Sequence, residues 1–371
     1  MKRDDMTQWP VVALIGSYQP PFGGISVHLK RFSEYLEREG VEHVLYNTVS
    51  AAERLPRVVS VATHRVLWYT RFLLTHRCTV VHLLSVNWLA RVMFGVAAAL
   101  RTGKYALSIH GRSVSQALKS RNLAIALLTR WLLRRMDAII ASNPDIARDC
   151  IELAGVSPER IHIIPAFIPP PNDGRAEVPE YVRDYMASHY PLLSAVGWIG
   201  QIHEGHDVYG IDMMVALVQR LKGDHPRIGL VISVNGGPKD AVRETIQYIR
   251  QVVGDNIRFV EDPLDEFTPI AQQSDLFLRP TNTDGDAVCI REALYVGTPV
   301  VASDAVPRPS SCVLFKNRDI DDFEYHVRQA LSERDVLTRR ITEESVVDNA
   351  ESILLVYRRL MEKGVQRGAS E

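Results

Sequence analysis

The sequence predicts two doubly wound α/β domains, one in each half of the chain. Short apolar runs alternate with helical stretches, and most of these runs end at glycine or at polar residues. The alternation stops at a proline-rich segment, 165–178, and then restarts. The chain of 371 residues is also too long for a single ordinary domain, which has roughly 150 residues. We therefore expect two parallel sheets with helices on both faces.

In the first half, buried parallel strands are expected at short apolar runs. These runs are 11–15, 44–46, 79–84, 105–109, 137–141 and 161–164. A helix is expected over 25–39, because its apolar residues recur at helical spacing and Gly40 follows it. The segment 165–178 is dense in proline and is interpreted as the linker between the domains.

In the second half, the same reasoning predicts strands at 192–196, 228–234, 257–260, 276–278 and 299–302. A helix is expected at 212–221, and a terminal one at 344–364. The expected apolar face of the terminal helix consists of Leu354, Leu355, Tyr357 and Leu360. Sheets of this kind bind ligands beyond the carboxyl ends of their strands. Two of them facing each other would form a cleft that excludes water on closing.

Bulk composition narrows the class of protein. The chain is 46% hydrophobic and 23% charged, an ordinary globular balance, and its net charge of −1 gives no indication of nucleic-acid binding. Its four cysteines are widely spaced, which predicts neither a zinc site nor a disulfide framework, but reduced thiols in a cytoplasmic protein. Residues 1–10 are polar, so no signal peptide is expected. No apolar run approaches the roughly 20 residues of a membrane span.

Charge is unevenly distributed. Residues 54–136 contain no Asp or Glu but 14 Lys and Arg. Two segments within this stretch, 65–77 and 121–135, are both basic and apolar, a composition that favours binding to an anionic bilayer. The same pattern also fits amphipathic helices packed on their own sheet, or a surface that attracts an anionic nucleotide. Peripheral attachment to the inner face of a membrane is therefore one of two open interpretations.

Two places in the first half carry possible chemistry. Gly23 and Gly24 precede a helix, where the backbone can approach a phosphate and the helix N-terminus favours negative charge. A structural turn would look the same. His110 follows an expected strand, where its ring could bind a sugar hydroxyl or a phosphate oxygen. A histidine satisfied within its own loop is the alternative.

The third place is the segment 279–294, which leads from a strand into a helix. Its carboxylates, Asp284, Asp286 and Glu292, could accept hydrogen bonds from sugar and ribose hydroxyls. Arg279 and Arg291 could face a diphosphate. An acidic helix N-terminus is also ordinary capping, so composition alone leaves both interpretations open.

These motifs together resemble the retaining glycosyltransferases of family 4, which have the GT-B fold. The family pattern is two glutamates separated by seven residues, then an alanine and a later Gly-Xaa-Pro before a strand. Here Asp284, seven residues and Glu292-Ala293 match it, followed by Gly297-Thr-Pro299. The glycine loop at 20–26 and the segments 109–111, 137–142 and 161–165 are similar to further family landmarks in the same order.

The resemblance implies a role for each matched residue. Gly23 and Gly24 would approach the donor phosphates or the acceptor, and His110 would contact the transferred sugar. Glu292 would bind the ribose of the nucleotide. Asp284 would hold sugar hydroxyls, and the backbone that follows it would bind the phosphate. That backbone comprises Gly285, Asp286, Ala287 and Val288. Retention without an essential metal or other cofactor is also implied.

One departure concerns the donor phosphates. The family normally supplies an Arg and a Lys after the first strand of the second domain, but here Trp198 and Tyr209 stand at those places. We hypothesise that Arg279 and Arg291 replace the pair. Trp198 and Asn235, which follow neighbouring strands, are counted with the donor-binding residues. A metal site at His203, His206 and Asp207 is considered, but a loop that contacts donor or acceptor is preferred.

The resemblance implies three segments, 1–170 on the acceptor side, 171–345 for the nucleotide-sugar, and 346–371 as a helix crossing back to the first domain. The expected partners are a nucleotide-sugar and a carbohydrate or lipid-linked acceptor in cell-surface polysaccharide or glycolipid synthesis. Two alternatives remain. One is a catalytically silent sugar-nucleotide-binding subunit, and the other is a sugar-nucleotide epimerase of the same fold.

Overall fold

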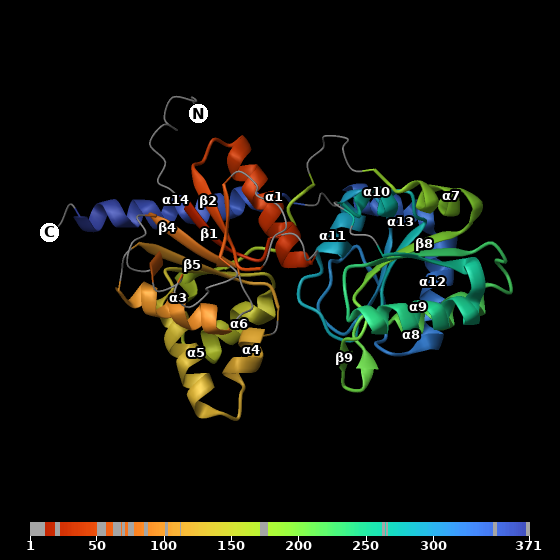
Figure 1. The fold of residues 1–371 in the computed structure, drawn as a ribbon, viewed down its shortest axis with the longest axis horizontal. Helices are drawn as coiled ribbons and strands as arrows, with labels where there is room; N and C mark the ends of the chain where they lie inside the picture. The colour runs from red at the N-terminus through yellow and green to blue at the C-terminus, as the bar shows by residue number, and fades with distance from the viewer. Residues whose placement is uncertain are drawn as a thin grey trace. The chain divides into compact units, whose positions relative to one another are not determined.

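The computed structural model describes residues 12–18, 23–49, 57–61, 68, 71–72, 78–84, 88–100, 103–111, 113–170, 177–261, 264, 266–343 and 347–368. The chain divides into two compact units, Met1–Ile168 with Asp348–Glu371, and Pro169–Val347. Each unit contains its own parallel sheet with helices on both faces (Figure 1), so the prediction of two α/β domains is confirmed. Part of the expected linker, 171–176, and part of the first glycine loop, 20–22, lie outside the described residues.

The sheet of the first unit has the order β3-β2-β1-β4-β5-β6-β7, and its strands are parallel. The strands are β1 (Val12–Gly16), β2 (His43–Asn47), β3 (Val58–Ser60), β4 (Val80–Leu84), β5 (Lys104–Ile109), β6 (Ala138–Ala141) and β7 (Ile161–Ile163). Only β3 was missed by the sequence patterns, because it is three residues long and lies half-exposed at an edge. β1 and β4 are buried along their whole length, as expected for central parallel strands.

Helices cover the two faces of this sheet (Figure 1). α1 (Gly24–Arg38) and α14 (Asn349–Gly368) pack on one face. The other face carries α3 (Trp88–Leu100), α4 (Ser113–Leu118), α5 (Leu123–Arg135) and α6 (Pro144–Glu152), and the 3-10 turn η2 (Pro158–Arg160) precedes β7. On α14, Leu354, Tyr357 and Leu360 are buried, but the expected core residue Leu355 is 41% exposed. Leu355 is turned about 100° from Leu354 and therefore points away from the sheet.

The sheet of the second unit has the order β12-β11-β8-β13-β14-β15 and is also parallel. Its strands are β8 (Leu192–Gly197), β11 (Gly229–Val234), β12 (Ile257–Val260), β13 (Leu276–Arg279), β14 (Val300–Ser303) and β15 (Val313–Phe315). One face carries α8 (Ile211–Leu221), α9 (Lys239–Val253) and α12 (Ile320–Ser332). The other carries α7 (Glu180–Ser188), α10 (Thr268–Gln272) and α11 (Val288–Tyr295). α13 (Arg334–Glu343) and the 3-10 turn η3 (Gly254–Asn256) complete the unit.

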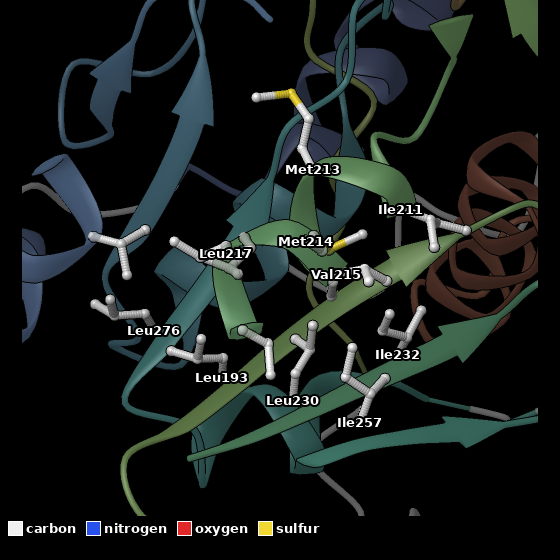
Figure 2. Packing of buried hydrophobic residues seen from close by; sticks show 14 of the residues in the cluster. Leu193, Ile211, Met213, Met214, Val215, Leu217, Leu230, Ile232, Ile257 and Leu276 are labelled. Atoms are coloured by element: carbon white, nitrogen blue, oxygen red, sulfur yellow. The ribbon is translucent and has the colours of Figure 1, made fainter. Parts of the chain in front are cut away.

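Packing of α8 on its sheet shows how this core forms. Met214 and Leu217 of α8 lie over Leu193 of β8 and Leu230 of β11 (Figure 2). All four side chains are fully buried. This packing fixes where α8 begins, and its first turn lies just beyond the carboxyl end of β8.

An antiparallel hairpin joins β8 to α8, where the sequence predicted a plain loop. It consists of β9 (Ile202–His203) and β10 (His206–Asp207). Two-residue strands give too little periodicity to be read from sequence. Within the described residues, no helix is long and apolar enough to span a bilayer.

Candidate donor-binding and histidine sites

The loops after β8, β11 and β13 meet at one edge of the second sheet, because the carboxyl ends of parallel strands share an edge. The amide of Ile199 donates to the carbonyl of Gly236 at 3.0 Å, which joins the first two loops. The amide of Asn282 donates to the carbonyl of Val208 at 3.2 Å, which joins the loop after β13 to the segment between β8 and α8. The fold therefore gathers the predicted residues Trp198, Asn235, Arg279 and 284–292 of the second unit at one edge.

Two glycines allow these loops to approach so closely. Gly210, the N-cap of α8, has a φ of +66°, and a Cβ there would lie 2.3 Å from the carbonyl oxygen of Pro280. Gly236 has a φ of +156°, and a Cβ there would lie 2.6 Å from the ring of Trp198. Trp198 and Asn235 are both half-buried. Trp198 thus packs on the glycine turn that follows β11.

A carboxylate between two arginines lies at the centre of this edge. Oδ2 of Asp284 accepts hydrogen bonds from Nε of Arg279 and from Nη1 of Arg308, both at 3.0 Å. It also accepts from the Thr281 hydroxyl at 3.3 Å, while Oδ1 accepts from the Gly285 amide at 3.0 Å. The side chains of Arg279, Arg308 and Asp284 are 8%, 2% and 12% exposed. We refer to these three residues as the arginine–aspartate cluster.

The cluster carries one more positive than negative charge. Burial alone would raise the pKa of Asp284, but Arg279 and Arg308 outweigh it and hold this pKa far below its usual range. Burial would lower the pKa of Arg279, yet Asp284 raises it. The guanidinium of Arg279 also lies over the ring of Tyr209, 4.9 Å from its centroid. A buried cation therefore stands beside Tyr209, the residue that replaces the expected lysine.

The other three charged residues of the motif, Asp286, Arg291 and Glu292, are arranged differently. Arg291 bonds through Nε to both carboxylate oxygens of Asp286, at 2.9 and 3.1 Å. Glu292 is 5% exposed on α11. The N-cap residue of α11, Ala287, makes no side-chain cap hydrogen bond. The amides of this first turn remain suited to an anion.

In the first unit, α1 brings the glycine motif close to His110. Gly23 is the N-cap of α1, and its amide donates to Ser26 Oγ at 2.9 Å. His28, one turn into α1, contacts His110 with ring centroids 4.9 Å apart. Both ring nitrogens of His110 are buried and have no hydrogen-bond partner among the described residues. No described residue of its own loop satisfies His110, and Arg112 of that loop lies outside the described residues.

Asp207, one of the hairpin residues considered for a metal, stabilises a helix start instead. Oδ1 of Asp207 accepts a hydrogen bond from the Ile211 amide at 3.0 Å and so stabilises the start of α8. In the described part of the chain, no group of three or more His, Cys, Asp or Glu side chains is arranged to hold a metal ion.

Two residues of these sites were missed in the sequence. Arg308 follows β14 in a loop without a recognisable motif, and only its position beyond a strand end signals it. His28 lies at a core-facing position of α1, where the sequence does not distinguish it from an ordinary packing residue. Both became visible only through their contacts.

Two family models match consecutive parts of the chain. Glycosyltransferase Family 4 matches residues 22–170, and Glycosyl transferases group 1 matches residues 194–333. A D-inositol 3-phosphate glycosyltransferase of Xylanimonas cellulosilytica is 30% identical over 179 residues, 45% of this chain and 40% of the relative. One of Geodermatophilus obscurus is 23% identical over 272 residues, 68% of this chain and 58% of the relative. The matched regions thus span about half the length of these curated relatives.

Solved structures show the same fold over nearly the whole chain. Sucrose-phosphate synthase from Thermosynechococcus elongatus has a TM-score of 0.71 at 15% identity, covering 95% of this chain and 100% of that one. HepE of Anabaena in complex with UDP-glucose has a TM-score of 0.66 at 13% identity, covering 96% and 99%. The two units therefore form a GT-B fold. The chain belongs to the family 4 (group 1) glycosyltransferases.

Replacing Asp284 by Asn tests the arginine–aspartate cluster. The change leaves two buried guanidinium groups without a counter-charge, so we expect the free energy of unfolding at neutral pH to fall by about 3 kcal/mol. Because the pKa of Asp284 is lowered in the folded state, its contribution is full above about pH 4 and is lost as pH falls further. The difference from wild type should therefore shrink in acid. Urea denaturation at several pH values measures both effects.

The matched control is Asp240→Asn, because Asp240 is 89% exposed and pairs with Arg243 at 3.9 Å. It should cost less than about 0.5 kcal/mol. Equal losses in the two variants would show that Asp284 does not hold the cluster together.

Proposed function

We propose that the chain transfers a sugar from a nucleotide-sugar donor to a carbohydrate or lipid-linked acceptor, with retention and without a metal ion. The observation that carries this proposal is the buried, net positive arginine–aspartate cluster at the carboxyl edge of the second sheet. Retention is what the Asp284 and Glu292 pattern of the family implies. The proposal also includes a role for this transfer in cell-surface polysaccharide or glycolipid synthesis.

The cluster suits a leaving diphosphate. As the glycosidic bond breaks, negative charge develops on the diphosphate, and fixed cations in a poorly hydrated site stabilise it. Arg279 and Arg308 supply those cations, with the first turn of α11 adding amide groups beside them. Arg291 is bonded to Asp286, so Arg308, rather than Arg291, is the second cation of the proposed phosphate site. This revises the hypothesis that Arg279 and Arg291 act as the pair.

The comparisons support the class of ligands. HepE was solved with UDP and with UDP-glucose, which supports a nucleotide-sugar donor here. The curated relatives are named for D-inositol 3-phosphate, which supports a hydroxyl-rich acceptor that also carries negative charge. Glu292 would bind the ribose, and His110 the transferred sugar.

A catalytically silent, nucleotide-sugar-binding subunit is the second candidate. Trp198 and Tyr209 favour it, because the Arg and Lys usual at these places are absent. Donor binding without sugar transfer to any acceptor would support this candidate. A new glycosidic product would exclude it.

A thermal-shift screen with UDP, GDP and dTDP sugars tests the donor site. A donor at 100 times its dissociation constant should stabilise the folded protein by about 2.7 kcal/mol. We expect one nucleotide class to raise the melting temperature of the wild type, and Glu292→Ala to lose most of this shift. Glu244→Ala, an exposed glutamate of α9 in the same unit, is the control and should keep it. If none of the nucleotide-sugars stabilises the wild type, donor binding is contradicted.

We propose in addition that α5 contacts an anionic bilayer. Leu123 and Leu127, four residues apart, are 74% and 59% exposed, and Arg134 and Arg135 are exposed on the same helix. Such a face combines apolar area with positive charge, which anionic lipid complements. Most of the other basic and apolar segment, 65–77, lies outside the described residues.

Sedimentation with phosphatidylglycerol vesicles tests this surface. Replacing Leu123 and Leu127 by Ser should weaken vesicle binding at least about tenfold, because buried leucines supply much of the affinity. Binding should also decline with added salt. Replacing the exposed Val336 and Val347 of the second unit by Ser is the control. No sedimentation of wild type at low salt, or equal binding by both double variants, would refute bilayer contact.

A further inference from the structure

Tyr209 lies against the buried cation of the second unit. The guanidinium carbon of Arg279 is 4.9 Å from the centroid of the Tyr209 ring. Tyr209 comes from the turn before α8 and Arg279 from the end of β13, so both belong to the second unit. The side chain of Arg279 is 8% exposed, and a cation is attracted to an aromatic face more strongly where water is excluded. The stack therefore differs from an exposed surface contact.

The backbone on both sides of Tyr209 is anchored to the loop after β13. The Val208 carbonyl accepts a hydrogen bond from the Asn282 amide at 3.2 Å. Gly210 has a φ of +66° and lies so close to the Pro280 carbonyl that a side chain would not fit. Because the chain is held immediately before and after Tyr209, its ring has little freedom to leave Arg279.

The guanidinium of Arg279 is held from three directions. Its Nε donates to Oδ2 of Asp284 at 3.0 Å, and its Nη1 donates to the Val196 carbonyl at 3.3 Å. The Tyr209 ring covers one face. Neither of the two hydrogen bonds engages Nη2, which carries two further N–H groups. An oxygen of a diphosphate can accept from these groups.

The second cation of the cluster has a different task. Arg308 donates through Nε to the Ser303 carbonyl at 3.2 Å, through Nη1 to Asp284 at 3.0 Å and through Nη2 to the Thr281 hydroxyl at 2.7 Å. Its side chain is 2% exposed. All three nitrogens of Arg308 thus have protein acceptors, so Arg308 acts on an anion mainly through its charge. Direct contact falls to Arg279.

Tyr209 cannot replace the charge of the lysine that the family has at this place. Burial raises the pKa of Tyr209, and Arg279 only partly opposes this shift. The phenol is therefore neutral near neutral pH and neither adds a cation nor cancels the charge of Arg279. Tyr209 also packs against the apolar core that α8 covers, so simple core packing is the alternative to a role at Arg279.

We propose that Tyr209 is a positioning residue that holds the guanidinium of Arg279 toward the donor diphosphate. This role rests on the proposed function, since the nucleotide-sugar supplies the diphosphate. In place of the family's lysine, which would add a cation, the ring orients the cation that β13 supplies.

Two substitutions of Tyr209 test this role. Tyr209→Leu keeps an apolar side chain for the core but removes the aromatic face, whereas Tyr209→Phe keeps the face. Binding of inorganic pyrophosphate, UDP, GDP and dTDP is followed by 31P NMR titration into the millimolar range. We expect Tyr209→Leu to weaken pyrophosphate and the bound nucleoside diphosphate about five- to tenfold. Tyr209→Phe should stay within about twofold of the wild type.

A double-mutant cycle with Arg279→Met separates positioning from packing. If Tyr209 acts through Arg279, Tyr209→Leu should weaken pyrophosphate binding in the wild type but cause no further loss in the Arg279→Met background. If Tyr209 only packs in the core, the loss should be the same in both backgrounds, and this result would overturn the positioning role.

Tyr185 provides the matched control, because it also stacks with an arginine in the second unit. The guanidinium of Arg258 lies 5.2 Å from its ring centroid, and Tyr185 is 3% exposed. Its hydroxyl accepts from the Leu230 amide at 3.1 Å, near the amino end of β11 and thus away from the carboxyl edge. Tyr185→Leu should lower stability in urea but leave pyrophosphate binding unchanged.

The outcomes distinguish this role from the proposed function. Unchanged diphosphate binding in Tyr209→Leu, together with its loss in Arg308→Met, would overturn the positioning role and leave the donor site in place. Binding of pyrophosphate that depends on Tyr209, without binding of any nucleoside diphosphate, would contradict the proposed function alone. Absence of binding by all four ligands would overturn both.

Discussion

The site of the second unit depends on one carboxylate held between two buried cations. Asp284 is the counter-charge that allows Arg279 and Arg308 to remain below the protein surface, and the excess positive charge then has no protein partner of opposite sign in the cluster. Parallel strands explain why this charge lies at an edge, because Arg279 ends β13 and Arg308 lies in the loop that follows β14. Gly210 lets the first turn of α8 approach Pro280 from the other side. An anion would complete this arrangement.

In the first unit, the polar side chains near the carboxyl edge of the sheet are neutral rather than charged. Its polar residues near the carboxyl edge are neutral histidines whose pKa values are lowered by burial. Neutral imidazoles distinguish hydroxyls by hydrogen-bond direction rather than by charge. The buried ring of His82 accordingly pairs with the neutral hydroxyls of Tyr357 and Ser108 rather than with a charged group.

Sequence patterns predicted the fold well because buried parallel strands are nearly continuous apolar runs. They missed β3, β15 and the β9–β10 hairpin, which are short and partly exposed. Candidate residues near motifs, such as Asp284 and His110, were found because strand ends mark them. Arg308 lies 24 residues from Asp284 and shares no local pattern with it, so only folding reveals their contact. His28 and Leu355 show the same limit, since helical periodicity does not tell what a face will meet.

Hydrogen exchange of the protein with and without nucleoside diphosphate tests the central claim most directly. The claim is that the carboxyl edge of the second sheet binds the donor diphosphate. It predicts that the diphosphate of the nucleotide class that binds slows exchange in peptides covering 197–212 and 279–292, and that Arg308→Met removes this protection. An alternative binding surface in the same unit is the groove of about 500 Å³ lined by Arg243, Gln247, Arg250 and Glu261. Protection confined to that groove, or unchanged in the Arg308 variant, would contradict the claim.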